Sequence, residues 1–362
     1  MHKNDQMTPN QRLMAFMSGQ PMDRCLAIPF CCTMSGQFCD MTHKEKRSTA
    51  EAEARCQIEG YKRLGNDLMI VEYGLHQFGR RLGTKATDPE KSGPALTEFV
   101  IESLDEFEAK IDTLDFSLLL PENDPFCQQK IKAAQIIRDE IGEEVSTGML
   151  LAAPFSSMFS IVKPEVMLRA LRKRPDLVKK LQEKTAATFK ALCKAFIEQA
   201  GTMILYCEPF TSADLISTKA FEEFVYPTIK ECIAYIHECK GMCCLHICGS
   251  AIKLIDMMAE SGADMISIDE KCDWAEVCKI AGSKKTVVGN VAPVDYFILG
   301  NKESITEECK KVIKTAYQNP YGFVLASGCD LSGYVPIENI EAFMEAARKY
   351  GKMPINPDNW ED

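Results

Sequence analysis

The chain has 362 residues, of which 46% are hydrophobic and 26% are charged, and its formal net charge at pH 7 is -10. This acidity argues against nucleic acid as a partner, because clustered Lys and Arg side chains are needed to bind a phosphate backbone. The sequence shows neither a leader with a basic region before an apolar core nor the run of about 18 apolar residues that a membrane span needs. We therefore expect a cytoplasmic protein that does not bind a membrane.

Short apolar, β-branched runs alternate with longer helical segments along the chain, a pattern typical of βα units and a parallel sheet. The eight predicted strands are residues 26–30, 67–72, 145–150, 203–208, 242–246, 264–269, 286–290 and 323–327. The predicted helical segments between them include residues 50–64, 164–201 with a break near Pro175, 219–240, 251–261, 305–317 and 337–350.

Eight strands separated by helices favour a closed barrel over an open sheet, because a barrel leaves no strand edge unpaired. An open nucleotide-binding sheet would place a glycine-rich loop after its first strand, whereas residues 29–34 contain no glycine. We predict that residues 1–362 form one (β/α)₈ TIM-barrel domain with an N-terminal helical extension. Residues of about 83–124 are predicted to be an insertion after strand 2, either a lid or a surface excursion.

The chain contains 17 cysteines, which is many for a protein of this length. Because 17 is an odd number, the cysteines cannot all pair with one another. Without a secretory leader they are not expected to form a disulfide framework, and most are expected to act as small buried hydrophobes. So many free thiols are best tolerated where oxidants are scarce, which favours an anaerobic source.

Three residues whose sulfur or imidazole nitrogen atoms can bind a soft metal ion fall at predicted strand ends. In a barrel these strand ends meet at one mouth. His246 and Cys248 are two residues apart, so in extended backbone their side chains point to the same side. Cys329 follows the last predicted strand. Two thiolates and one imidazole favour Zn²⁺ with a fourth position left for water or substrate, so the sequence predicts a catalytic type of zinc site at these three residues.

Other polar residues near the strand ends are candidate catalytic groups. Glu208 could accept a proton, complete the zinc sphere or pair with a basic group, and Asp269 allows similar alternatives. His76 lies beyond the second strand and is either a catalyst or a hydrogen-bonded structural histidine.

These residues carry a resemblance to the uroporphyrinogen decarboxylase superfamily over nearly the whole chain. The matching segments are residues 7–12, 19–24, 208–217, 246–249, 267–269, 289–293 and 327–330. True decarboxylases of this superfamily have an arginine-rich segment after the first strand that binds the carboxylates of their substrate. The corresponding residues 29–36 contain no arginine, so the chain is more similar to the zinc-dependent, corrinoid-linked methyltransferase branch.

In that branch the pattern His-x-Cys followed by a distant Cys holds zinc, which the resemblance transfers to His246, Cys248 and Cys329. The resemblance implies methyl transfer between a corrinoid (cobalamin) carried by a partner protein and a small molecule. This molecule is either a thiol such as coenzyme M, whose pKa zinc lowers, or a methyl donor such as a methoxylated aromatic compound. The direction of transfer stays open, as does the choice between a monomer and a homodimer.

Two other functions remain as alternatives. The first is a decarboxylase or lyase on the same barrel in which Glu208 and Asp269 perform acid–base chemistry and the cysteines are incidental. The second is a non-catalytic barrel that binds a corrinoid protein without transferring a methyl group.

Overall fold

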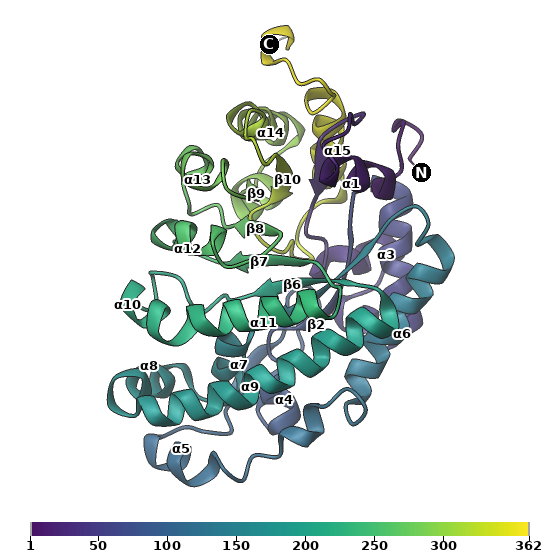
Figure 1. The fold of residues 1–362 in the computed structure, drawn as a ribbon. Helices are drawn as coiled ribbons and strands as arrows, with labels where there is room; N and C mark the ends of the chain where they lie inside the picture. Colours follow the sequence, from purple (N-terminus) through teal and green to yellow (C-terminus); the bar gives the residue numbers. More distant parts are fainter. Residues whose placement is uncertain (1, 361–362) are drawn as a thin grey trace.

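The computed structural model describes residues 2–360, which build an eight-stranded parallel sheet surrounded by helices (Figure 1). The strands of this sheet are β1 (Leu26–Ile28), β2 (Met69–Gly74), β5 (Thr147–Ala152), β6 (Met203–Cys207), β7 (Cys243–Ile247), β8 (Met265–Ile268), β9 (Thr286–Val291) and β10 (Phe323–Ser327). Their order in the sheet is β1-β10-β9-β8-β7-β6-β5-β2. Each strand overlaps one of the predicted strands.

The two ends of the sheet meet between β1 and β2. The Asp67 amide donates a hydrogen bond to the Ala27 carbonyl (3.0 Å), and the Ala27 amide donates to the Asp67 carboxylate (2.6 Å). A side chain thus continues the hydrogen bonding where the strands themselves do not form a ladder. The prediction of a (β/α)₈ barrel is confirmed.

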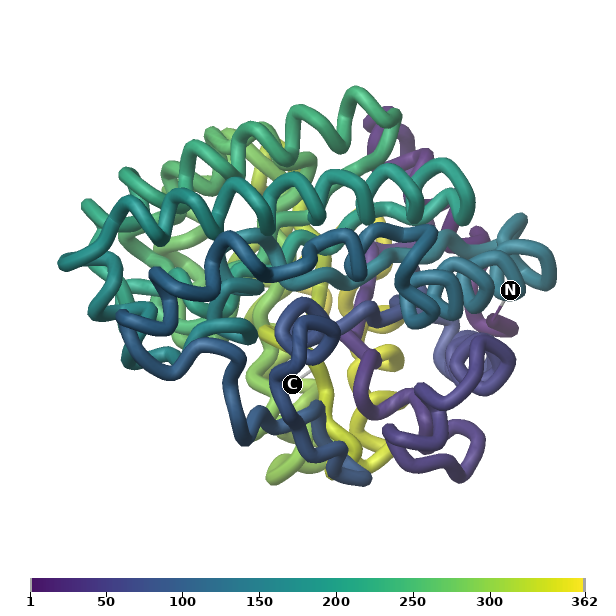
Figure 2. The backbone as a smooth tube through the Cα atoms, turned by 90° about the horizontal axis from the view of Figure 1, so that it is seen from below, coloured from purple at the N-terminus to yellow at the C-terminus, as the bar shows by residue number. Residues whose placement is uncertain are grey.

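Helices cover the outside of the sheet. They include α3 (Ala50–Leu64), α6 (Pro125–Ile141), α8 (Pro164–Lys173), α9 (Pro175–Ala195), α11 (Tyr226–Glu238), α12 (Ile255–Ala259), α13 (Trp274–Ala281), α14 (Lys302–Ala316) and α15 (Ile337–Tyr350). Pro175 opens α9, as predicted, because proline fits the first turn of a helix where its missing N–H costs no hydrogen bond. Helices α9 and α11 run side by side, as Figure 2 shows. Across residues 2–360, every helix is too short or too polar to cross a membrane.

Further helical segments fill the connections. They are α1 (Pro9–Met17), η1 (Thr33–Cys39), α2 (His43–Lys46), α4 (Gln77–Leu82), α5 (Leu104–Lys110), η2 (Phe116–Leu119), α7 (Pro154–Ile161), η3 (Phe196–Ala200), α10 (Thr218–Ala220), η4 (Phe221–Val225), η5 (Ile252–Leu254), η6 (Pro293–Ile298) and η7 (Pro357–Asn359). The insertion after β2 is confirmed and contains an antiparallel hairpin of β3 (Lys85–Thr87) and β4 (Ala95–Glu98). Phe107 and Leu119 anchor it, since both side chains are buried.

The sheet separates two apolar cores. One lies between the strands and the helices and includes Cys243, whereas a smaller one inside the barrel includes Cys244. These consecutive cysteines occupy opposite cores because successive side chains of a strand point to opposite faces.

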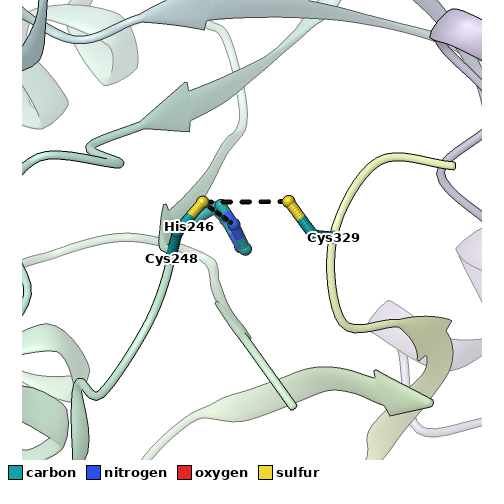
Figure 3. Close-up of side chains that lie close together, drawn as sticks. All are labelled: His246, Cys248 and Cys329. Atoms are coloured by element: carbon teal, nitrogen blue, oxygen red, sulfur yellow. Dashed lines mark hydrogen bonds between the residues drawn. The ribbon is translucent and has the colours of Figure 1, made fainter. Parts of the chain in front are cut away.

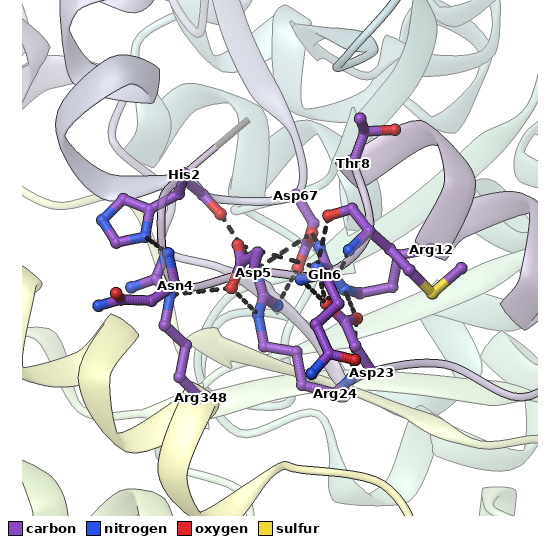
Figure 4. A network of polar contacts seen from close by, with 12 residues as sticks. His2, Asn4, Asp5, Gln6, Thr8, Arg12, Asp23, Arg24, Asp67 and Arg348 are labelled. Carbon is purple, nitrogen blue, oxygen red and sulfur yellow. Dashed lines mark hydrogen bonds and ion pairs between the residues drawn. The ribbon is translucent and has the colours of Figure 1, made fainter.

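An N-terminal extension with α1 is tied to the barrel by a buried network of charges (Figure 4). Arg12 is fully buried and donates to Asp23 (2.7 and 2.8 Å) and to Asp67. Arg24 donates to Asp67 (2.6 Å) and to Asp5 (3.1 and 3.2 Å). Asp67 therefore links the extension to the seam between β1 and β2, and each buried charge has opposite charges beside it.

Candidate active site

The three predicted metal ligands lie together at the carboxyl ends of the strands. His246 is on β7 and Cys248 directly follows it, while Cys329 faces them from the loop after β10 (Figure 3). The Nε2 atom of His246 lies 3.1 Å from the Cys248 Sγ, which lies 3.8 Å from the Cys329 Sγ. One ligand atom from each residue falls within 4.8 Å of the others. Residues 81 positions apart in the chain thus form one donor cluster.

This spacing fits a tetrahedral zinc ion. Two thiolates bonded to zinc at about 2.3 Å with a tetrahedral angle stand about 3.8 Å apart. The separation of the two sulfur atoms here is 3.8 Å. Two sulfurs and one imidazole nitrogen are also the donor types that zinc prefers, so the residues present fit this ion.

The environment fixes the orientation of the His246 ring and of the loop after it. The Nδ1 atom of His246 is hydrogen-bonded to the Ser267 hydroxyl (3.0 Å), which leaves Nε2 for the side of the cysteines. Gly249, with a φ of 74°, then turns the chain away. Its amide donates to the Asp269 carboxylate (2.7 Å), so Asp269 holds the loop that carries Cys248.

The pKa values of the two cysteines are shifted in opposite directions. The hydrogen bond from Cys248, followed by that from His246, holds the pKa of Cys329 well below its usual range, although burial opposes this shift. The hydrogen bond to Cys329 and burial raise the pKa of Cys248. Burial tends to lower the pKa of His246, but its hydrogen bond and attraction to Cys329 raise it. A thiolate stabilised in this way is the form that binds a metal ion.

A cavity of about 80 Å³ opens at these residues. Its walls are apolar side chains, sulfur atoms and a few polar groups. The lining residues are Phe30, Cys32, Glu72, Leu75, Leu150, Leu205, Cys207, Pro209, Cys244, His246, Cys248, Ser267, Cys329 and Asp330. The sequence places Glu72 and Asp330 at strand ends, but only the structure brings both carboxylates into the same cavity.

Glu208 is a buried carboxylate beside the cavity, with 1% of its surface exposed. It accepts hydrogen bonds from the amides of Phe155 (3.3 Å) and Ser156 (2.8 Å) at the start of α7. Burial raises the pKa of Glu208 to about 7, and these hydrogen bonds oppose the shift. The group can therefore hold or release a proton near neutral pH.

Asp269 and His76 have different surroundings. Asp269 accepts hydrogen bonds from the amides of Gly249 (2.7 Å) and Lys271 (3.0 Å). His76 precedes α4, and burial lowers its pKa. The residues that line the cavity do not include Asp269, His76 or Glu208. Their catalytic roles stay predictions.

Fold and donor set together define a TIM-barrel protein with a cluster of soft-metal donors, able to hold a metal ion, at the carboxyl ends of its strands. The family model described as uroporphyrinogen decarboxylase (URO-D) matches residues 8–350, and the chain belongs to this family. The resemblance found in the sequence is thereby confirmed.

Similar proteins include methyltransferases along nearly the whole chain and uroporphyrinogen decarboxylases, one of which, from Zea mays, is 28% identical over 228 residues that cover 60% of this chain and 56% of the relative. The methylcobamide:CoM methyltransferase MtaA of Methanosarcina barkeri is 23% identical over 354 residues, which cover 95% of this chain and 99% of the relative. Methylcobamide:CoM methyltransferase MtbA of Methanosarcina mazei is 25% identical over 358 residues, covering 95% and 98%. A solved structure of a methyltransferase from Methanosarcina mazei has a TM-score of 0.82 at 21% identity and covers 95% of this chain and 99% of that one. The prediction of an enzyme of the methyltransferase type is confirmed, and the solved structure supports the fold.

Proposed function

We propose that this protein is a zinc-dependent enzyme that moves a methyl group between the corrinoid of a partner protein and a small molecule. The observation that carries the proposal is the cluster of His246, Cys248 and Cys329, whose sulfur atoms stand 3.8 Å apart at the barrel mouth. The methylcobamide-dependent relatives, similar along nearly the whole chain, support the corrinoid partner.

His246, Cys248 and Cys329 would hold the zinc and leave a fourth position directed to the cavity. Zinc bound there supplies Lewis-acid chemistry: it lowers the pKa of a bound thiol or polarises the heteroatom that carries the methyl group. Ser267 fixes the His246 ring and Asp269 fixes the loop of Cys248, so both act by positioning ligands. The apolar walls exclude water from the reacting group.

The size of the cavity favours a small methyl acceptor or donor. Its volume is about 80 Å³, whereas a cavity that binds benzene measures about 150 Å³. A methoxylated aromatic compound would therefore require the walls to move, while a short thiol or another small methyl compound would not. Within residues 2–360, Phe30 is the one Phe, Tyr or Trp side chain that lines the cavity.

The decarboxylase alternative receives less support from the cavity. A substrate with several carboxylates needs basic side chains around it. Within residues 2–360 the cavity lining includes no Lys or Arg, and it includes the carboxylates of Glu72 and Asp330. These two groups would repel a polyanion.

We further propose that the corrinoid protein docks over the mouth, because the cavity opens there, and that the enzyme works in the cytoplasm. All 17 cysteines are free thiols, which suits a reducing compartment.

The proposal is tested by methyl transfer from methylcobalamin to small thiols under anaerobic conditions. We expect zinc-dependent loss of methylcobalamin and formation of the thioether, both abolished by Cys329→Ala. The Cys239→Ala variant is the control, since Cys239 follows α11 and precedes the amino end of β7, whereas the mouth lies at the carboxyl ends of the strands. Transfer that survives chelation of zinc and the Cys329→Ala substitution would contradict the proposal.

A further inference from the structure

The polar groups of the cavity have an unusual balance of charge for a site that would take an anionic ligand. Glu72 and Asp330 are its two carboxylates, and within the described residues no Lys or Arg lines it. The basic side chains of this region lie instead in a separate pocket lined by His43, Lys44, Arg47, Gln77, Arg80, Arg81, Asp88 and Phe126. The two cavities share no lining residue.

The two carboxylates of the cavity differ in what they can still bind. Asp330 accepts hydrogen bonds from the amides of Cys32 (2.9 Å) and Thr33 (3.2 Å) and from the Thr33 hydroxyl (2.6 Å). It is thus engaged in holding the loop after β1. Glu72 is 7% exposed, and its Oε2 atom is buried without a hydrogen-bond partner among residues 2–360. The His43 Nε2 atom nearest to it is also without a hydrogen-bond partner among these residues, so the Glu72 carboxylate, which lines the cavity, retains acceptor capacity that a ligand can use once the carboxylate turns toward it.

Neighbouring cations keep Glu72 ionised but do not occupy its free oxygen. Burial would raise the pKa of Glu72, but the charges of Arg47 and Lys46 lower it to about 2. Lys46 donates to the Cys32 carbonyl (2.6 Å), and the Arg47 guanidinium lies over the Phe126 ring. The nearest ring nitrogen of His43 is 3.8 Å from the Oε2 atom. A buried carboxylate with an unused oxygen favours a hydrogen-bond donor beside it.

We propose that Glu72 is a specificity-determining residue that accepts a hydrogen bond from the small molecule held at the metal site. This inference rests on the proposed function and specifies the substrate class: the small molecule carries a hydroxyl or ammonium group at a short distance from the atom that binds the metal. A sulfonate or carboxylate in that position would be placed beside Glu72 and Asp330 and would be disfavoured. The thiol substrate of this enzyme would then differ from coenzyme M, which appears in the names of the relatives.

The test uses zinc-loaded wild-type protein and four thiols that differ in the group at the end remote from sulfur. They are cysteamine with an ammonium, mercaptoethanol with a hydroxyl, ethanethiol with a methyl group and coenzyme M with a sulfonate. Dissociation constants are measured by anaerobic titration calorimetry. We expect cysteamine and mercaptoethanol to bind more tightly than ethanethiol, and coenzyme M to bind about tenfold or more weakly than cysteamine.

The Glu72→Gln variant then assigns the preference to this side chain. We expect it to reduce the difference between cysteamine and coenzyme M while leaving the affinity for ethanethiol nearly unchanged. Glu140→Gln, on the exposed surface of α6, is the matched control. The wild-type series is sufficient if Glu72→Gln does not fold. Equal affinities, or tighter binding of coenzyme M, would overturn this inference alone, whereas binding of none of the four thiols would overturn it together with thiol binding at zinc.

Discussion

His246 and Ser267 are directly paired across strands β7 and β8, and the Nδ1 atom of the imidazole lies 3.0 Å from the serine hydroxyl. This contact fixes the ring so that Nε2 is directed toward Cys248, 3.1 Å away. Because such supporting hydrogen bonds orient metal ligands, we expect Ser267→Ala to weaken zinc binding about 10- to 100-fold without preventing folding. Competition with a chromogenic chelator measures the change.

Ser261→Ala is the control for this substitution. Ser261 is also buried, but its hydroxyl donates to the Met258 carbonyl (2.7 Å) at the end of α12, away from the metal ligands. Its zinc affinity should equal that of the wild type. Unchanged affinity in Ser267→Ala would show that the ring is held by packing alone.

Asp67 should be decisive for stability because it joins the barrel seam to the N-terminal extension. Asp67→Ala leaves two buried guanidinium groups, Arg12 and Arg24, short of a counter-charge and removes the acceptor of the Ala27 amide. Breaking a buried ion pair from one side costs about 3 to 5 kcal/mol, and we expect a loss of this size in the free energy of unfolding. Denaturant unfolding measures it, with the surface variant Glu140→Gln as a reference that should change little. A loss as small as that of the reference would contradict the role assigned to Asp67.

Glu208 should make stability depend on pH near neutrality. Burial raises its pKa from 4.5 to about 7, so between these values the folded protein holds a proton that the unfolded chain has released. Stability from this group is therefore present below pH 4.5 and is lost as pH rises through about 7. The shift corresponds to about 3 kcal/mol in the difference between wild type and Glu208→Gln.

Unfolding of the two proteins at a series of pH values isolates this contribution, because other titrating groups cancel in the difference. Parallel pH profiles would show that Glu208 titrates normally in the folded protein. The methyl-transfer activity of the same variant tests the separate prediction that Glu208 handles a proton during catalysis.

Much of the fold could be predicted because its signals are local. Each strand is a short apolar run, and proline or glycine marks several helix boundaries, such as Pro175 at the start of α9. The candidate metal ligands could also be predicted from the sequence, since His246 and Cys248 are two residues apart and Cys329 follows the last strand. The topology of a barrel then brings these strand ends together.

The remaining features depend on contacts between distant parts of the chain. Asp67 pairs with Arg12 and Arg24 across 55 and 43 positions, and Asp330 binds the amide of Cys32 across 298. Glu72 stands out only because one of its oxygens is buried without a partner in the described chain. No local pattern encodes that property, because it is set by what surrounds the side chain in space.

Zinc content per chain of the anaerobically purified protein tests the central claim most directly. Wild type and the Cys239→Ala control should each contain one zinc per chain, whereas Cys248→Ala and Cys329→Ala should have lost it while keeping the melting behaviour of a folded barrel. Zinc retained in both site variants, or missing from wild type with its thiols intact, would contradict the metal site and the methyl-transfer function that rests on it.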